Sequence, residues 1–166
     1  MTMERLRVYV ETSVISYLTA RPGRDVVVAG RQVSTRAWWE RAQHEQQLVT
    51  SDEVLREAAH GDPEAARARL AALAPLPCLN INDDVRGLAE VYRRALALPD
   101  RAAADAVHLA LASIHHVDAI ASWNCCHIAS AQVQRMVSTV NQRLGLPVPY
   151  LATPEMLLGE ETADDP

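Results

Sequence analysis

Short apolar runs alternate with longer amphipathic stretches along the chain. Five runs carry the β-branched and aromatic residues typical of strands, at residues 7–10, 47–50, 78–81, 118–123 and 148–152. The stretches between them predict helices over residues 12–18 and 36–47, after residue 51, from residue 63 to the prolines at 75 and 77, and over 83–97, 102–115 and 129–143. Ser51, Asp62 and Asn82 stand where helix N-caps are expected, and Gly145 stands where the last helix should end.

Strands that alternate with helices, without an Asn-Gly type of hairpin signal, predict parallel pairing through crossover helices. The expected fold is therefore α/β: a three-layer sandwich with a mostly parallel five-stranded sheet. A chain of 166 residues suits one domain. We expect that domain over residues 1–158, followed by a disordered acidic tail at residues 159–166. In such sheets ligands bind at the carboxyl ends of the strands, near the point where strand order reverses.

The composition is that of a globular protein with an aliphatic core. Hydrophobic residues make up 49% of the chain, but aromatics only 4%, and Phe is absent. The net charge of −5 is partly terminal, because the segment from residue 159 onward carries four acids: Glu160, Glu161, Asp164 and Asp165. The rest holds 16 basic residues, all arginine, and 17 acidic ones, so a polyanionic partner is neither demanded nor excluded.

Three cysteines, two of them adjacent, do not form a disulfide framework. No apolar run approaches the length of a membrane span, and the residues before the first strand do not make a signal peptide. We therefore expect a cytoplasmic protein with no membrane partner.

Three acids fall where the sheet should collect ligands. Glu11 ends the first strand, Glu57 lies on the helix after the second, and Asp105 lies early in the helix before the fourth. Carboxylates grouped at one place stay ionised together only if a cation compensates them, and their hard oxygen atoms suit Mg²⁺ or Mn²⁺. Two interpretations stay open from spacing alone: a metal site, or three solvated acids among the 21 of this chain.

Four segments surround these acids. They are residues 8–18 (VYVETSVISYL), 51–57 (SDEVLRE) with HGDP at 60–63, 105–112 (DAVHLALA), and 118–124 (DAIASWN) with HI at 127–128. In this order the chain resembles the PIN-domain nucleases, and within them the VapC-like toxins of bacterial toxin–antitoxin pairs. The resemblance extends over nearly the whole chain up to residue 152.

The resemblance implies a Mg²⁺- or Mn²⁺-dependent endoribonuclease with Glu11, Glu57 and Asp105 as catalytic metal ligands. It also implies an RNA substrate, with a cognate antitoxin and a homodimer as further partners. The family usually carries Asp where this chain has Glu11, and Asn124 occupies a fourth, variable acidic position. These two departures favour an alternative: a catalytically degenerate PIN-like domain that binds RNA or a protein.

Residues near the three acids are candidates to support them by hydrogen bonding. Thr12 and Ser13 can hydrogen-bond Glu11 or act as ordinary N-caps. His108 shares a helix face with Asp105, one turn away, where it can support that acid or pack in the core. Any of the 16 arginines could grip a phosphate, and the sequence does not select one.

Other chemistries find little support. Cys125, Cys126 and His127 are too close together to share one tetrahedral zinc ion. The chain has neither a glycine-rich phosphate loop nor a Gly-x-Ser-x-Gly elbow. We interpret Trp38 and Trp39 as packing or interface residues, and we place Asp118 at the opposite edge of the sheet because it begins its strand.

Overall fold

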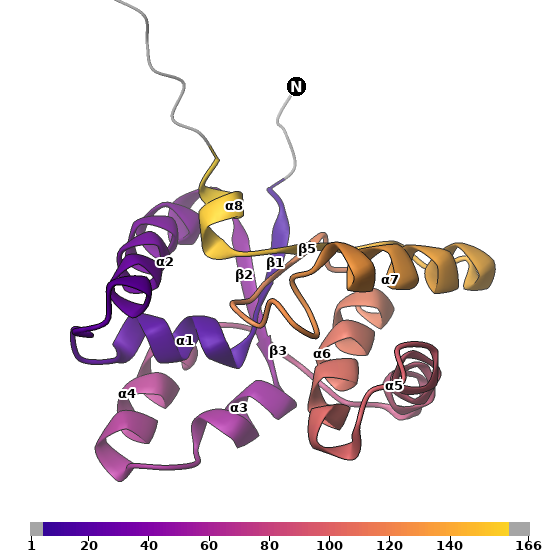
Figure 1. Cartoon of the computed structure of the whole chain (residues 1–166), viewed down its shortest axis with the longest axis horizontal. Helices are drawn as coiled ribbons and strands as arrows, with labels where there is room; N and C mark the ends of the chain where they lie inside the picture. The colour runs from indigo at the N-terminus through magenta and orange to yellow at the C-terminus, as the bar shows by residue number, and fades with distance from the viewer. Residues whose placement is uncertain (1–4, 160–166) are drawn as a thin grey trace, which may run out of the picture.

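The computed structural model describes residues 5–159, so the tail expected at residues 159–166 lies outside that range except for Gly159. Five strands and eight α-helices follow one another within the described residues (Figure 1). The strands are β1 (Arg7–Val10), β2 (Gln47–Ser51), β3 (Cys78–Leu79), β4 (Ala119–Ala121) and β5 (Tyr150–Ala152). The helices are α1 (Thr12–Thr19), α2 (Val26–Glu45), α3 (Asp52–Ala58), α4 (Pro63–Leu73), α5 (Asp83–Ala95), α6 (Ala103–Ile114), α7 (Ala131–Leu144) and α8 (Pro154–Leu158), with a 3-10 turn, η1 (Asp100–Ala102), before α6.

All four strand pairs are parallel, in the order β3-β2-β1-β4-β5. Helices α1 to α4 cover one face of the sheet and α5 to α7 cover the other, which makes the expected three-layer α/β sandwich (Figure 1). The chain builds outward from β1 to β3 and then returns to add β4 on the other side of β1. The reversal of strand order therefore lies between β1 and β4, next to Glu11.

Local capping explains most helix starts. The side chains of Ser51, Asp62 and Asn82 each accept a hydrogen bond from a backbone N–H in the first turn of their helices, as predicted. Gly145 ends α7 with φ of 67°, a left-handed conformation that glycine adopts without steric cost.

The structure corrects several boundaries. Helix α2 begins at Val26, well before the expected residue 36. Asp25 caps it, although four valines and Gly30 lower its helix propensity. The last three strands are shorter than predicted, at 78–79, 119–121 and 150–152. Helix α8, capped by Thr153, was not predicted.

The core lies on both sides of β1 and around α6. The strand residues Val8, Tyr9 and Val10 are fully buried, and α6 is buried along almost its whole length. Trp38 of α2 is also buried, and Trp39 packs against the core, which agrees with a packing role for both.

A side chain covers the outer edge of β5. The Gln134 carboxamide of α7 accepts a hydrogen bond from the Leu151 N–H at 2.8 Å and donates one to the Pro149 carbonyl at 3.1 Å. These bonds fix α7 against the last strand.

Candidate metal centre

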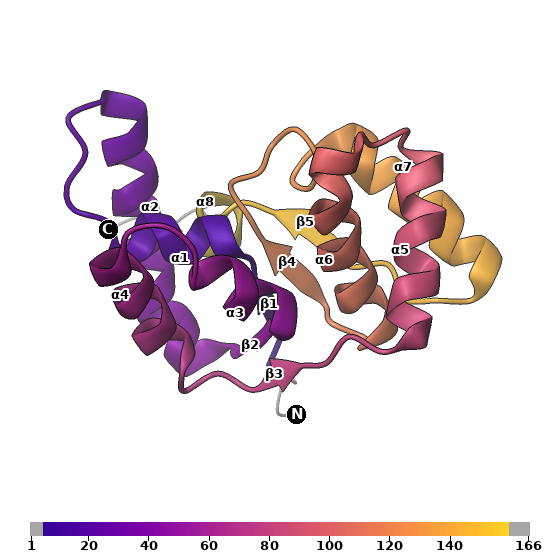
Figure 2. The same ribbon diagram turned by 90° about the horizontal axis from the view of Figure 1, so that it is seen from below.

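The sheet register gathers polar side chains at the carboxyl ends of the three central strands. Glu11 directly follows β1, and its backbone N–H continues the β1–β4 pairing by donating to the Ala121 carbonyl at 3.1 Å. Ser51 ends β2, and Ser122 directly follows β4. Helices α3 and α6 lie on either side of these strands (Figure 2). They bring Glu57 and His108 to the same place.

Two hydroxyl groups hold the Glu11 carboxylate. The Ser13 and Ser122 hydroxyls both donate to Oε2 of Glu11, the latter at 2.7 Å. The Ser13 oxygen also accepts the Trp123 backbone N–H at 2.8 Å. Within the described residues no hydrogen bond reaches Oε1, so this buried carboxylate keeps one oxygen for a ligand.

A hydrogen-bonded chain links Glu57 to the core. Nε2 of His108 contacts Oε1 of Glu57 at 2.9 Å, and its Nδ1 contacts the Tyr9 hydroxyl at 2.6 Å. The Tyr9 hydroxyl also contacts the Ser51 hydroxyl at 2.7 Å, and the Ser51 oxygen accepts the Val54 N–H that begins α3. This series of hydrogen bonds therefore connects β1 and α6 to α3, the helix that carries Glu57.

The electrostatics favour charge on both Glu57 and His108. Partial burial is the largest influence on the Glu57 pKa and raises it, but the hydrogen bond and charge of His108 outweigh burial, so this pKa lies below its ordinary value. Burial likewise lowers the His108 pKa, but the Glu57 bond and the nearby charges of Glu11 and Glu57 outweigh it, and the pKa is raised. Burial raises the pKa of Tyr9 well above 10, so Tyr9 stays neutral.

Glu11, Glu57 and His108 form one compact group. Each offers a ligand atom, and these atoms lie within 4.8 Å of one another. Both ring nitrogens of His108 are engaged, Nε2 by the Glu57 carboxylate and Nδ1 by the Tyr9 hydroxyl, so neither is left for a metal. We therefore assign His108 as the residue that orients Glu57, and the two carboxylates as the metal-binding groups.

The donor set fits a hard divalent cation. In the part of the chain that the structure describes, one oxygen of Glu11 accepts no hydrogen bond, and His108 contacts only one oxygen of Glu57. The buried hydroxyl of Thr12 lies close enough to Glu57 to help lower its pKa, yet it finds no hydrogen-bond partner of good geometry among residues 5–159. An unsatisfied hydroxyl beside two carboxylates is what an oxygen-liganded ion or its bound water would complete.

Asp105 stands in a second cluster, one helical turn before His108 on α6. Its Oδ1 accepts from the Asn124 carboxamide and its Oδ2 contacts Nδ1 of His127, both at 2.9 Å. The Asn124 Oδ1 in turn accepts the His127 backbone N–H at 3.0 Å. The described residues thus bring Glu11 and Glu57 together, and place Asp105 outside that compact group.

The residues expected to support the acids also fall into two groups, one around Glu11 and Glu57 and one around Asp105. Ser13 bonds Glu11 as anticipated, whereas Thr12 faces Glu57; neither caps α1, whose N-cap is Glu11. His108 is both a buried core residue and the partner of Glu57, not of Asp105. Asn124 contacts Asp105.

Sequence reasoning did not assign three residues of the site: Tyr9, Ser122 and His127. Tyr9 occupies an interior strand position, where an aromatic residue signals only packing. Ser122 and His127 lay within the segments compared above, but nothing in their spacing showed which acid each contacts. Asp118 lies at the other edge of the sheet, as expected, where its carboxylate accepts the Arg7 backbone N–H at 2.7 Å.

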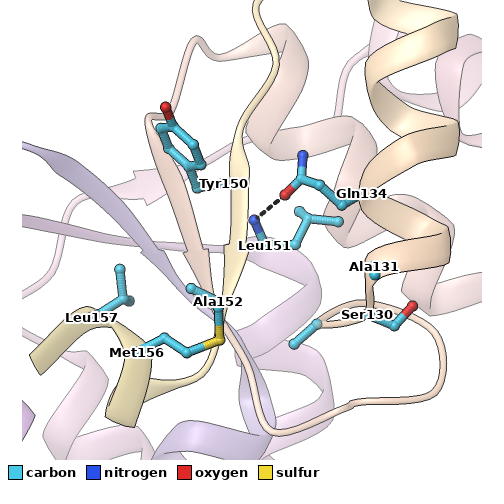
Figure 3. Close-up of a pocket in the computed structure, with 9 residues that line it drawn as sticks. Ser130, Ala131, Gln134, Tyr150, Leu151, Ala152, Met156 and Leu157 are labelled. Carbon is cyan, nitrogen blue, oxygen red and sulfur yellow. Dashed lines mark hydrogen bonds between the residues drawn. The ribbon is translucent and has the colours of Figure 1, made fainter. Parts of the chain in front are cut away.

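A cavity of about 490 Å³ lies elsewhere, between α7, β5 and α8 (Figure 3). Its walls include the side chains of Leu151, Met156 and Leu157, and neither acid of the metal group lines it. Gln134 stands at its rim with its carboxamide oxygen on the Leu151 N–H (Figure 3). The one titratable side chain among its lining residues is that of Tyr150, and no acid, histidine or cysteine of the described residues lines it.

Comparison with known proteins gives no independent assignment. No protein-family model matches the sequence, and no curated protein shows significant similarity to it. Among residues 5–159, no helix combines the length and apolar character needed to cross a membrane. The function is therefore argued from the site.

Proposed function

We propose that this chain is a divalent-metal-dependent endoribonuclease of the PIN-like type. The observation that carries the proposal is the compact group of Glu11, Glu57 and His108 at the reversal of strand order, where parallel α/β sheets bind ligands. Its carboxylates suit Mg²⁺ or Mn²⁺, and the sequence resemblance supplies the substrate class, RNA.

Glu11 and Glu57 would hold the cation. When bound, Mg²⁺ or Mn²⁺ supplies a Lewis acid that polarises a phosphoryl oxygen and lowers the pKa of a coordinated water. Ser13 and Ser122 fix the orientation of the Glu11 carboxylate, whose side chain is one methylene longer than that of Asp. His108 keeps Glu57 ionised and aimed at the site.

Asp105 is the candidate to position the attacking water. Its carboxylate is aligned by Asn124 and His127, as a base or a metal-bound acid is commonly aligned by its neighbours. To become a metal ligand it would have to exchange one of these two hydrogen bonds.

The second candidate function is a degenerate PIN-like module that binds RNA or a protein without cutting. One observation favours it: both oxygens of Asp105 are already engaged by side chains, outside the compact group. Such a module would fold around the same residues but would need no metal.

An RNA cleavage assay separates the two. A labelled single-stranded RNA should be cut with Mn²⁺, remain intact in excess chelator, and be cut again when Mn²⁺ is restored, with no need for Zn²⁺. Asp105→Asn should lower activity by orders of magnitude without changing the fold. Asp118→Asn, which removes a charge at the opposite end of β4, should cut normally. Cleavage that persists in chelator would exclude the proposed mechanism, and the absence of both Mn²⁺ binding and cleavage would support the module.

The biological setting that the resemblance implies is also part of the proposal. We propose a toxin of a toxin–antitoxin pair, with an antitoxin and a second copy of the chain as partners. The three free cysteines are consistent with the reducing environment of the cytoplasm. Co-expression with the product of a neighbouring reading frame should relieve growth arrest if this assignment holds.

A further inference from the structure

Most basic side chains around the metal centre are already paired with carboxylates. Arg56 contacts Glu53 on α3, and the two histidines of the site contact Glu57 and Asp105. An RNA backbone approaching these acids would meet mainly negative charge. A ribonuclease at this place needs a cation that is fixed beside the site and still free to bind phosphate.

Arg31 of α2 meets that requirement. Its guanidinium carbon lies 5.2 Å from the centre of the Trp123 ring and 5.8 Å from that of Tyr17, and Nη1 donates to the Tyr17 hydroxyl at 3.2 Å. Within residues 5–159, no carboxylate oxygen lies within 4.0 Å of it. The charge is therefore held by two aromatic rings and not neutralised by an acid.

The rings beneath Arg31 are themselves fixed. The Trp123 indole N–H donates to the Thr35 hydroxyl at 2.8 Å, and Thr35 is one turn along α2 from Arg31. Tyr17 and Trp123 pack edge to face, with centres 6.1 Å apart. Trp123 is only 8% exposed, so its ring serves as a support for the guanidinium and offers no face for stacking a base.

The same tryptophan joins Arg31 to the metal centre. Its backbone N–H bonds the Ser13 hydroxyl that holds Glu11, and the next residue, Asn124, holds Asp105. The hydrogen bond to Tyr17 raises the pKa of Arg31, with a smaller contribution from the nearby Cys125. Arg31 therefore lies against Trp123, in the loop after β4 that is hydrogen-bonded to both acid clusters.

We propose that Arg31 binds a phosphate of the RNA strand close to the cleaved bond. This inference rests on the proposed ribonuclease function and identifies the arginine that the sequence could not select. A guanidinium has five N–H donors, and Arg31 uses one of them on Tyr17. A pair of N–H groups therefore remains for bidentate contact with phosphate. Because the rings hold its orientation, little further side-chain entropy is lost on binding.

The test compares Arg31→Met and Arg31→Gln with Arg36→Met. Arg36 is an exposed arginine on the same helix, and no carboxylate among residues 5–159 pairs with it, so the control removes the same charge. Arg31→Gln keeps a donor for Tyr17 and replaces the methionine variant should that one fail to fold. Binding of a fluorescein-labelled single-stranded RNA is followed by anisotropy in EDTA, where the strand stays uncut, over a range of salt concentrations.

Loss of one phosphate contact should reduce the slope of log affinity against log salt by about 0.7. In both Arg31 variants we expect this reduction, a fall in affinity of about 10-fold or more, and in Mn²⁺ a comparable rise in KM with a smaller change in kcat. Arg36→Met should retain the wild-type slope, and Arg31→Lys should restore it. Mn²⁺ affinity should be unchanged throughout, because Arg31 is not a metal ligand.

An unchanged slope and affinity in the folded Arg31 variants would overturn the proposal, and so would an equal loss in Arg36→Met or no recovery in Arg31→Lys. A purely structural role predicts lower stability with a wild-type salt slope. If the wild-type protein cuts RNA but the Arg31 variants match it, only this inference fails. If the wild-type protein neither binds nor cuts RNA, the proposed function fails with it.

Discussion

Replacing Tyr9 by Phe tests the hydrogen-bonded chain that supports Glu57. The substitution keeps the buried ring but removes the hydroxyl, which is the partner of Nδ1 of His108 and of the Ser51 hydroxyl. Ser51 still accepts the Val54 N–H, whereas Nδ1 of His108 loses its partner at a position that is 1% exposed.

The expected loss of stability follows from the unpaired Nδ1 of His108. A buried donor or acceptor without a partner destabilises a fold by about 1–3 kcal/mol. In a domain of this size, each kcal/mol lowers the melting temperature by about 2–4 °C, so Tyr9→Phe should melt roughly 2–12 °C earlier. Mn²⁺ binding should weaken as well, since His108 would hold Glu57 less firmly.

Urea and thermal unfolding followed by circular dichroism measure the stability, and Mn²⁺ titration measures the site. Tyr150→Phe is the matched control: this tyrosine is 72% exposed, and its loss should change stability by less than about 0.5 kcal/mol. If Tyr9→Phe unfolds at the wild-type midpoint and binds Mn²⁺ equally well, the hydrogen bonds from Tyr9 to His108 and Ser51 do not support the site, and the reasoning is refuted.

Three further predictions concern the length of the side chain at position 11, the charge of His108 and the reactivity of Cys78. Glu11→Asp should withdraw the carboxylate by about one bond length of 1.5 Å, weakening Mn²⁺ binding and cleavage; a gain of both would mean that the site had decayed. In metal-free protein, the raised pKa of His108 stabilises the fold below about pH 6.5, and this contribution is lost as pH rises through the folded-state pKa; Glu57→Gln should flatten that loss in urea unfolding. Burial and Asp52 raise the pKa of Cys78 to about 11, so its alkylation by iodoacetamide should be slow at pH 8.5 and faster in Asp52→Asn, and equal rates would contradict this.

Capping residues and hydrophobic periodicity predicted the order of strands and helices. Caps such as Ser51 and Asp62 act within one helical turn, so they can be read from neighbouring residues. The start of α2 was not predicted although Asp25 is such a cap, because the valines that follow Asp25 favour strands; packing of residues such as Trp38 holds the helix. Tertiary context overrode propensity there.

The site was predictable only in part. Glu11 and Glu57 lie at strand and helix ends, so the parallel sheet alone predicts that they approach one another. Their partners depend on contacts between distant segments: Ser122 is 111 residues from Glu11, and His108 is 51 residues from Glu57. No spacing rule reaches that far, and for the same reason the sequence did not predict that Asp105 would be held by Asn124.

The carboxamide of Gln134 has a consequence for self-association. An uncovered strand edge invites another chain to pair with it and so promotes aggregation. At β5, the Pro149 carbonyl and the Leu151 N–H are already bonded to Gln134, so an incoming strand would have to displace both bonds before forming its own. The opposite edge, β3, offers only Cys78 and Leu79. An incoming strand would therefore meet bonded backbone groups at β5 and only two residues at β3, so growth of the sheet at either edge is disfavoured.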